Sequence, residues 1–173
     1  MKKQINNSSC RKKLSKIVIC LFVGLQAVSC VTLQPVSINQ AESIQDYQYI
    51  YITPTNTVNS TSGGVYGNGY GVTGITSTKS ANPTDLISGY FIKKGYTRLP
   101  DLVPDLLDKT LVINYGESGS RGVLFGSVTE ITIQFLSAKT MRPICVATSE
   151  GYGDTMADDI RIAINRCLDK LFE

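Results

Sequence analysis

The stretch Ile131-Thr132-Ile133-Gln134-Phe135 alternates apolar and polar side chains without a break. A period of two is typical of a strand with one buried and one solvated face. We therefore expect a long strand over 123–136, with its isoleucines and phenylalanine facing a core. A turn over 137–143 and a returning strand over 144–149 follow it, which predicts an antiparallel pair.

The C-terminal segment carries a different period. Its apolar residues recur every three or four positions: Ile160, Ala163, Ile164, Cys167, Leu168 and Leu171. This spacing predicts an amphipathic helix over 156–172 with one face on the core. Thr155, followed three residues later by Asp158, resembles a capping box at its start.

A second helix is expected after Asn82, which is a suitable N-cap and is followed by Pro83 in the first turn. Gly95 is the expected left-handed residue at its end. A strand is expected over 47–52 and a buried strand over 110–115. Together these elements predict an α+β domain, with one mixed or mainly antiparallel sheet of four to five strands and both helices on one face.

The expected strand over 47–52 has an aromatic face formed by Tyr47, Tyr49 and Tyr51. We expect this face to be covered or partly covered in the domain. The alternative is an exposed edge strand to which a partner adds a strand.

The N-terminus has the layout of a bacterial lipoprotein signal: a basic stretch over 12–16, an apolar stretch over 17–28, then Ser29 and Cys30. The apolar stretch is too short to span a bilayer, which needs about 20 residues. We expect a signal peptide over 1–29, lipid attachment at Cys30 through acyl chains such as palmitate, a tether over 30–45 and a single domain over 46–173. Ordinary signal peptidase cleavage at the same bond and an uncleaved chain stay open as alternatives.

Cleavage before Cys30 changes the charge of the chain. The precursor has a formal net charge of +3, but six of its 17 Lys+Arg lie in 1–29, whereas all 14 Asp+Glu follow. The mature chain therefore keeps 11 basic and 14 acidic residues, a net charge of −3. We expect no nucleic-acid partner, because such partners require a basic surface.

Two of the five cysteines remain in the expected domain, Cys145 and Cys167. We expect two buried thiols, since free cysteine is among the most buried residue types. A disulfide is the alternative in an oxidising compartment.

A glycine-rich run over 59–80 is expected to be a long loop, with Tyr66 and Tyr70 as candidate contact residues. It contains Gly69-Tyr70-Gly71-Val72-Thr73-Gly74, a literal G-x-G-x-x-G. Dinucleotide binding needs these glycines directly between a strand and a helix, which the expected elements do not provide. We therefore expect no nucleotide.

The chain has no histidine, which excludes histidine-based triads and histidine zinc sites. Glu117, Ser118 and Arg121 follow the expected strand over 110–115 and are candidate contact residues in a loop over 116–121. The sequence shows no acid or base that would act with these residues in catalysis. The acidic residues near 154–159 suit a helix N-terminus, so we expect no metal and no other cofactor.

Several segments resemble small uncharacterised lipoproteins of the Bacteroides type. These are the signal, the glycine-rich run, Ser80–Ile87, Leu111–Gly119 and Ala157–Ile164, and the resemblance covers most of 44–173. It implies a lipid-anchored envelope protein and brings no catalytic residues. The order of elements is more distantly similar to the N-terminal domain of the Tol-Pal propeller protein and to the curli-secretion lipoprotein, which implies a role in assembly at the outer membrane.

We therefore expect a non-enzymatic, membrane-anchored protein that works by contact with another protein of the cell envelope. Residues 31–34 have no acidic run that resembles a surface-export signal, which favours the periplasm. The alternatives are a surface-exposed module that binds a glycan or peptide, with Tyr66 and Tyr70 stacking on the ligand, and a histidine-free hydrolase.

Overall fold

The structure is a computed structural model that describes residues 31–54, 58–68, 71–124 and 126–173, with the backbone alone for 58–68 and 71–78. It divides into two units at Thr32/Leu33. The unit that begins at Leu33 holds every helix and strand described below.

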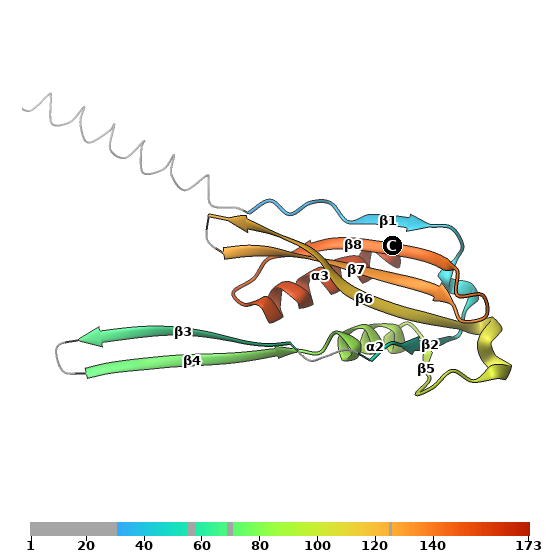
Figure 1. Cartoon of the computed structure of the whole chain (residues 1–173), viewed down its shortest axis with the longest axis horizontal. Helices are drawn as coiled ribbons and strands as arrows, with labels where there is room; N and C mark the ends of the chain where they lie inside the picture. The colour runs from blue at the N-terminus through green and yellow to red at the C-terminus, as the bar shows by residue number, and fades with distance from the viewer. Residues whose placement is uncertain (1–30, 55–57, 69–70, 125) are drawn as a thin grey trace, which may run out of the picture. The chain divides into compact units, whose positions relative to one another are not determined.

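A six-stranded mixed sheet in the order β1-β8-β7-β6-β2-β5 forms the body of this unit (Figure 1). Its antiparallel part pairs β1 with β8, β8 with β7 and β7 with β6, while β2 runs parallel to both β6 and β5. The strands are β1 (Ser37–Gln40), β2 (Tyr49–Ile52), β5 (Thr97–Arg98), β6 (Thr110–Val123), β7 (Gly126–Ser137) and β8 (Pro143–Gly151).

The α+β class and the mixed sheet are confirmed, but the expectation of four to five strands is wrong. The additional strands lie at the two edges. β1 falls inside the segment expected as a tether, and β5 has only two residues. Edge strands of this kind are short and polar, so they lack the alternation by which buried strands are recognised.

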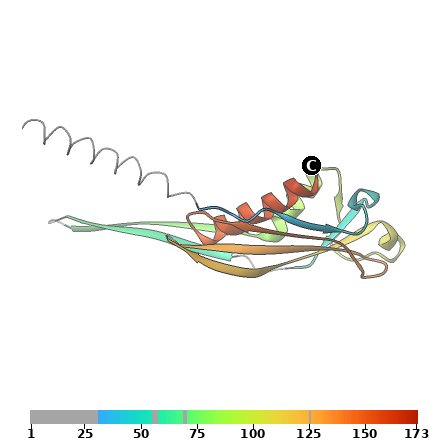
Figure 2. The ribbon, with the colours of Figure 1, turned by 90° about the horizontal axis from the view of Figure 1, so that it is seen from above.

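Two helices cover one face of this sheet (Figure 2), as the sequence predicts. α2 (Pro83–Lys93) begins at Asn82, whose side chain accepts a hydrogen bond from the Thr84 amide. α3 (Met156–Leu171) begins at Thr155, whose side chain accepts from the Asp158 amide. Both expected caps are present because each satisfies an amide that the first helical turn leaves unpaired.

The core lies between these helices and the apolar side of the strands. Ile131, Ile133 and Phe135 of β7 are fully buried, as are Phe91 of α2 and Ile164 of α3. The phenylalanine rings of β7 and α2 lie 5.9 Å apart. On β2 the isoleucines Ile50 and Ile52 are buried, while Tyr49 and Tyr51 stay half-buried on the opposite face. Among the described residues, no helix covers that opposite face, which is called the open face below (Figure 2).

The glycine-rich run expected as a loop is instead an antiparallel hairpin of β3 (Val58–Asn68) and β4 (Gly71–Ala81). This segment is extended because its glycines are interleaved with serine, threonine and valine. Threonine and valine favour the extended backbone of a strand. Gly71 and Gly74 lie on β4, away from the start of α2. At the base of the hairpin, Lys79 forms an ion pair of 2.7 Å with Asp158 of α3.

The loop expected over 116–121 is also a strand, because β6 continues to Val123. Val123, expected in the next strand, therefore belongs to β6. A register shift between Glu117 and Gly119 makes a β-bulge at Ser118. The two remaining short elements are the 3₁₀ helices η2 (Ile44–Asp46) and η3 (Pro104–Lys109).

Candidate functional site

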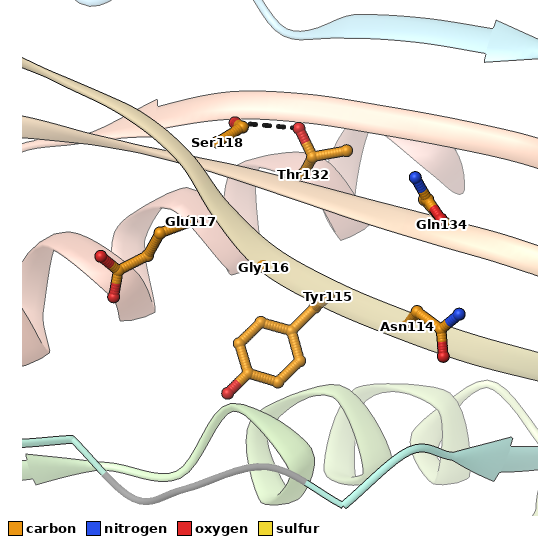
Figure 3. A pocket seen from close by; sticks show the side chains of 7 residues that line it. All are labelled: Asn114, Tyr115, Gly116, Glu117, Ser118, Thr132 and Gln134. Atoms are coloured by element: carbon orange, nitrogen blue, oxygen red, sulfur yellow. Dashed lines mark hydrogen bonds between the residues drawn. The ribbon is translucent and has the colours of Figure 1, made fainter.

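A shallow pocket of about 350 Å³, called the β6 pocket, lies on β6 and β7 (Figure 3). Seven residues line it: Asn114, Tyr115, Gly116, Glu117, Ser118, Thr132 and Gln134. Two of the predicted contact residues, Glu117 and Ser118, are therefore part of one site.

The register of β6 and β7 explains how the amide side chains meet. Asn114 pairs with Gln134, and Gly116 pairs with Thr132. Residues directly opposite each other project to the same face of an antiparallel pair. This face is the open face, because Ile133 between Thr132 and Gln134 is buried under the helices.

A chain of hydroxyl groups crosses three strands beside the pocket. The Ser118 hydroxyl donates to Glu130 Oε1 at 2.7 Å and accepts from Thr132 Oγ1 at 3.0 Å. Thr132 is in turn hydrogen-bonded to Thr148 of β8 at 2.9 Å. The bulge at Ser118 turns its side chain into this chain of hydroxyls, which is a common use of a bulge.

The carboxylate next to Ser118 in sequence is not the one that contacts its hydroxyl group. Glu117 and Ser118 are neighbours in sequence, yet their side chains point apart (Figure 3). The carboxylate that contacts Ser118 is Glu130, and this hydrogen bond is exposed to solvent. A serine nucleophile requires a base that is itself held by a third group.

Tyr115 supplies the aromatic side of the pocket. It is half-buried and packs against the core cluster, and in Figure 3 its ring points toward α2. Asn114 accepts a hydrogen bond from the Thr53 hydroxyl just beyond β2. Sequence reasoning missed Asn114 and Tyr115, although the polar side of the 131–135 alternation already indicated an open face.

Arg121, the third predicted contact residue in this region, is not part of the pocket. It belongs to a cluster of Gln34, Arg121, Glu150 and Arg166, called the Glu150 cluster. Glu150 is 4% exposed and receives two hydrogen bonds of 2.8 Å from Arg121. The Gln34 amide donates to Glu150 Oε2 at 2.7 Å, and Arg166 donates to the backbone oxygens of Glu150 and Gln34.

These partners decide the ionisation of Glu150. The hydrogen bond from Arg121 is the largest influence, and it lowers the pKa of Glu150 to about 2 against the opposing effect of burial. A buried carboxylate is tolerated in a protein only when it is paired and hydrogen-bonded in this manner. The cluster therefore stabilises the fold, and no local sequence pattern indicates it, since its members are far apart along the chain.

The acidic residues at the start of α3 also have structural partners. Asp158 bonds Lys79, Arg161 and Thr155, and the hydrogen bond from Lys79 is the main reason that its pKa is lowered. Asp159 is buried and accepts from Gly153 and Thr129, while burial raises its pKa. Among the described residues, no group of three or more acidic or cysteine side chains is placed to hold a metal ion.

Cys145 on β8 and Cys167 on α3 are both buried, and both are free thiols in the structure. Burial is the main cause of the raised pKa of each thiol, which for Cys145 reaches about 11. A thiol with a raised pKa is a poor nucleophile at neutral pH, so these residues are core side chains in this arrangement.

The remaining predicted residues are placed only in part. Tyr66 lies on β3, where the structure describes the backbone alone, and Cys30 and Tyr70 lie outside the described residues. Within the described segments, none of the helices has the length and apolar character needed to cross a membrane.

A second shallow pocket of about 310 Å³ lies at the other end of the domain, between Tyr47, Tyr96 and Phe172. The Lys94 ammonium group lies 5.2 Å from the centre of the Phe172 ring, a cation–π distance. Tyr47, a member of the predicted aromatic face, therefore lines this pocket.

No protein-family model and no curated protein matches the chain. Solved structures of PelC from Paraburkholderia phytofirmans are similar to it. A dodecamer of a PelC variant in space group C2 has 12% identity and a TM-score of 0.45, over 79% of this chain and 95% of that chain. The PelC dodecamer in space group P6 has 11% identity and a TM-score of 0.43, over 81% and 97%. A likeness at these scores carries no functional inference.

Proposed function

We propose that this chain is a lipid-anchored protein of the bacterial cell envelope that faces the periplasm and works by binding another envelope protein, without catalysis. The observation that carries the proposal is the open face of the sheet. It presents the hydrogen-bonding side chains of Asn114, Thr132 and Gln134 together at one shallow pocket.

The open face suits contact with a protein surface. Its central groups are amides and hydroxyls, which both donate and accept hydrogen bonds and carry no charge that would be costly to bury. The pocket is shallow, and Tyr115 borders it from the helix side of the sheet. Aromatic side chains of this kind are enriched among the residues that dominate binding energy.

The N-terminal sequence supports the location. A basic stretch, an apolar stretch of about a dozen residues and Cys30 have the order of a lipoprotein signal. Acyl chains on Cys30 would hold the domain at a membrane, where an envelope partner is within reach. The resemblance to envelope lipoproteins points in the same direction.

A photo-crosslinking amino acid at Gln134 tests the binding surface directly. Gln134 is exposed in the β6 pocket, and the matched control is Asn165, which is exposed on α3. Irradiation of intact cells is expected to give one discrete adduct with an envelope protein for the Gln134 variant and none for the Asn165 variant. Equal labelling at both sites, or none at Gln134, would contradict the proposal.

A second candidate is a module that binds a glycan, and one observation favours it. The pocket lining combines Tyr115, which projects to the helix side of the sheet, with the amides of Asn114 and Gln134, which project to the open face, and a lining of aromatic and polar groups suits a ligand with an apolar face and a polar rim. Under this candidate Tyr115→Ala abolishes retention on an immobilised envelope glycan, whereas Tyr115→Phe retains most of it. Under protein binding, neither variant changes that retention.

A further inference from the structure

The turn between β6 and β7 carries the most exposed large apolar side chain that the structure describes. Leu124 is 85% exposed, against 53% for Ile92 and 54% for Met141. A single exposed leucine is common on protein surfaces and needs no explanation by itself. Its position relative to the N-terminal segment is what makes it informative.

The β6–β7 turn lies at the end of the domain where the chain enters it. Arg121, three residues before Leu124, bonds Glu150, and Glu150 also accepts from the Gln34 amide. Both views show the turn beside the segment that leads into β1 (Figures 1 and 2). One buried carboxylate therefore joins Gln34 to Arg121, which lies three residues before the exposed leucine.

Gln34, at the point where the chain enters the domain, is held by hydrogen bonds at both its amide and its carbonyl group. The Gln34 amide donates to Glu150 at 2.7 Å, and the Gln34 carbonyl accepts from Arg166 at 2.8 Å. Only residues 31–33 separate Gln34 from Cys30. A fully extended chain spans at most about 3.6 Å per residue, so the chain between Gln34 and Cys30 can span no more than about 15 Å.

The surroundings of the turn also suit a membrane interface. A Cβ atom on Gly126 would lie 3.6 Å from the Tyr152 ring, so this half-buried tyrosine stands directly against the turn. Tyrosine is enriched where one end of a side chain is in apolar surroundings and the other in water.

We propose that the β6–β7 turn inserts Leu124 into the same bilayer that holds the acyl chains of Cys30. This inference rests on the proposed lipid anchor and adds a second membrane contact that would set the orientation of the domain. The β6 pocket would then stand clear of the membrane, since Ser118 is six strand residues from Leu124, a distance of about 20 Å.

Tryptophan fluorescence tests the proposal, because the chain contains no tryptophan. The test variant is Leu124→Trp. The matched control is Leu102→Trp, which is 40% exposed and precedes η3 at the opposite end of the β6–β7 hairpin. Each full-length lipoprotein is purified from membranes and reconstituted into phosphatidylcholine vesicles whose acyl chains carry bromine, a quencher of indole emission.

The Leu124→Trp protein is expected to lose about half of its emission in brominated vesicles and to shift its emission to shorter wavelength, while Leu102→Trp is unchanged. Both variants carry the same indole group, so the affinity of tryptophan itself for lipid does not explain a difference in quenching between them.

Vesicle flotation separates the two possible failures. If both variants float with the vesicles and Leu124→Trp is quenched no more than the control, the inserted turn is overturned and the lipid anchor stands. If neither variant floats, the anchor fails, and the inserted turn fails with it.

Discussion

Arg121 holds Glu150 through two parallel hydrogen bonds, Nε to Oε1 and Nη2 to Oε2, each of 2.8 Å. The pair joins the end of β6 to the end of β8 across the intervening strand β7. Bidentate pairs of this kind are among the strongest hydrogen bonds in proteins. Because Glu150 also binds the Gln34 amide, one carboxylate fixes two strands and the N-terminal segment together.

Glu150→Gln is expected to destabilise the domain by about 2 kcal/mol at pH 7, since it removes the charge that the Arg121 hydrogen bonds require. The pKa of Glu150 is lowered from 4.5 to about 2. Its contribution is therefore complete above the unfolded pKa and is lost as the pH falls from about 5 to 2. Urea unfolding at pH 7, 5 and 3 measures this dependence.

The control for this change is Glu117→Gln, an exposed carboxylate outside the cluster, which is expected to cost less than about 0.5 kcal/mol. The difference in stability between wild type and Glu150→Gln should shrink on acidification. A difference that stays constant from pH 7 to pH 3 would contradict the assignment.

Gly151→Ala is expected to destabilise the domain by about 3 kcal/mol or more. A Cβ atom at this position would lie 1.8 Å from the Asp159 carbonyl oxygen, so β8 and α3 approach each other at backbone distance. Gly122→Ala on β6 is the control, because a Cβ atom there has nothing within 4 Å. Thermal unfolding of both proteins distinguishes the close approach of β8 and α3 from a general effect of replacing a strand glycine. Equal losses of stability in the two variants would contradict the close approach.

Thr155→Ala is expected to cost about 1 kcal/mol, because it leaves the Asp158 amide at the start of α3 without its side-chain acceptor. Thr155→Ser keeps that acceptor and should recover most of the loss. Urea unfolding of the three proteins is the measurement. A serine variant as unstable as the alanine variant would show that the methyl group, rather than the cap, matters.

The helices and central strands could be predicted from the sequence because each carries its own local signal. Asn82 and Thr155 mark the helix starts, and the alternation around Ile133 marks β7. The pairing of β1 with β8 has no such signal, since Ser37–Gln40 is short, polar and mostly exposed. The hairpin of β3 and β4 was predicted to be a loop because it is rich in glycine, a residue that is common in turns and loops.

The candidate site was predicted in part for a similar reason. Glu117 and Ser118 were predicted because polar residues follow a buried strand. The orientation of their side chains depends on the β-bulge, for which the sequence has no recognisable pattern. The Glu150 cluster depends on contacts between Gln34, Arg121 and Glu150, and the first and last of these are 116 positions apart. Pairing over such a distance is a property of the tertiary fold.

The two thiols offer a test of the redox state of the domain. Cys145 and Cys167 are buried, with raised pKa values, so neither is expected to react with a thiol reagent in the native protein at pH 8. Both should react once the mature protein is denatured without reductant. Reaction of neither thiol after denaturation would indicate a disulfide and contradict the free thiols.

The intact mass of the native protein, extracted from membranes beside a Cys30→Ala variant, shows whether Cys30 carries the proposed lipid anchor. We expect a mass equal to residues 30–173 plus acyl chains for the native protein, and no acyl mass for the variant. An unmodified mature mass would contradict the lipid anchor, and an uncleaved mass would contradict both the anchor and the envelope location.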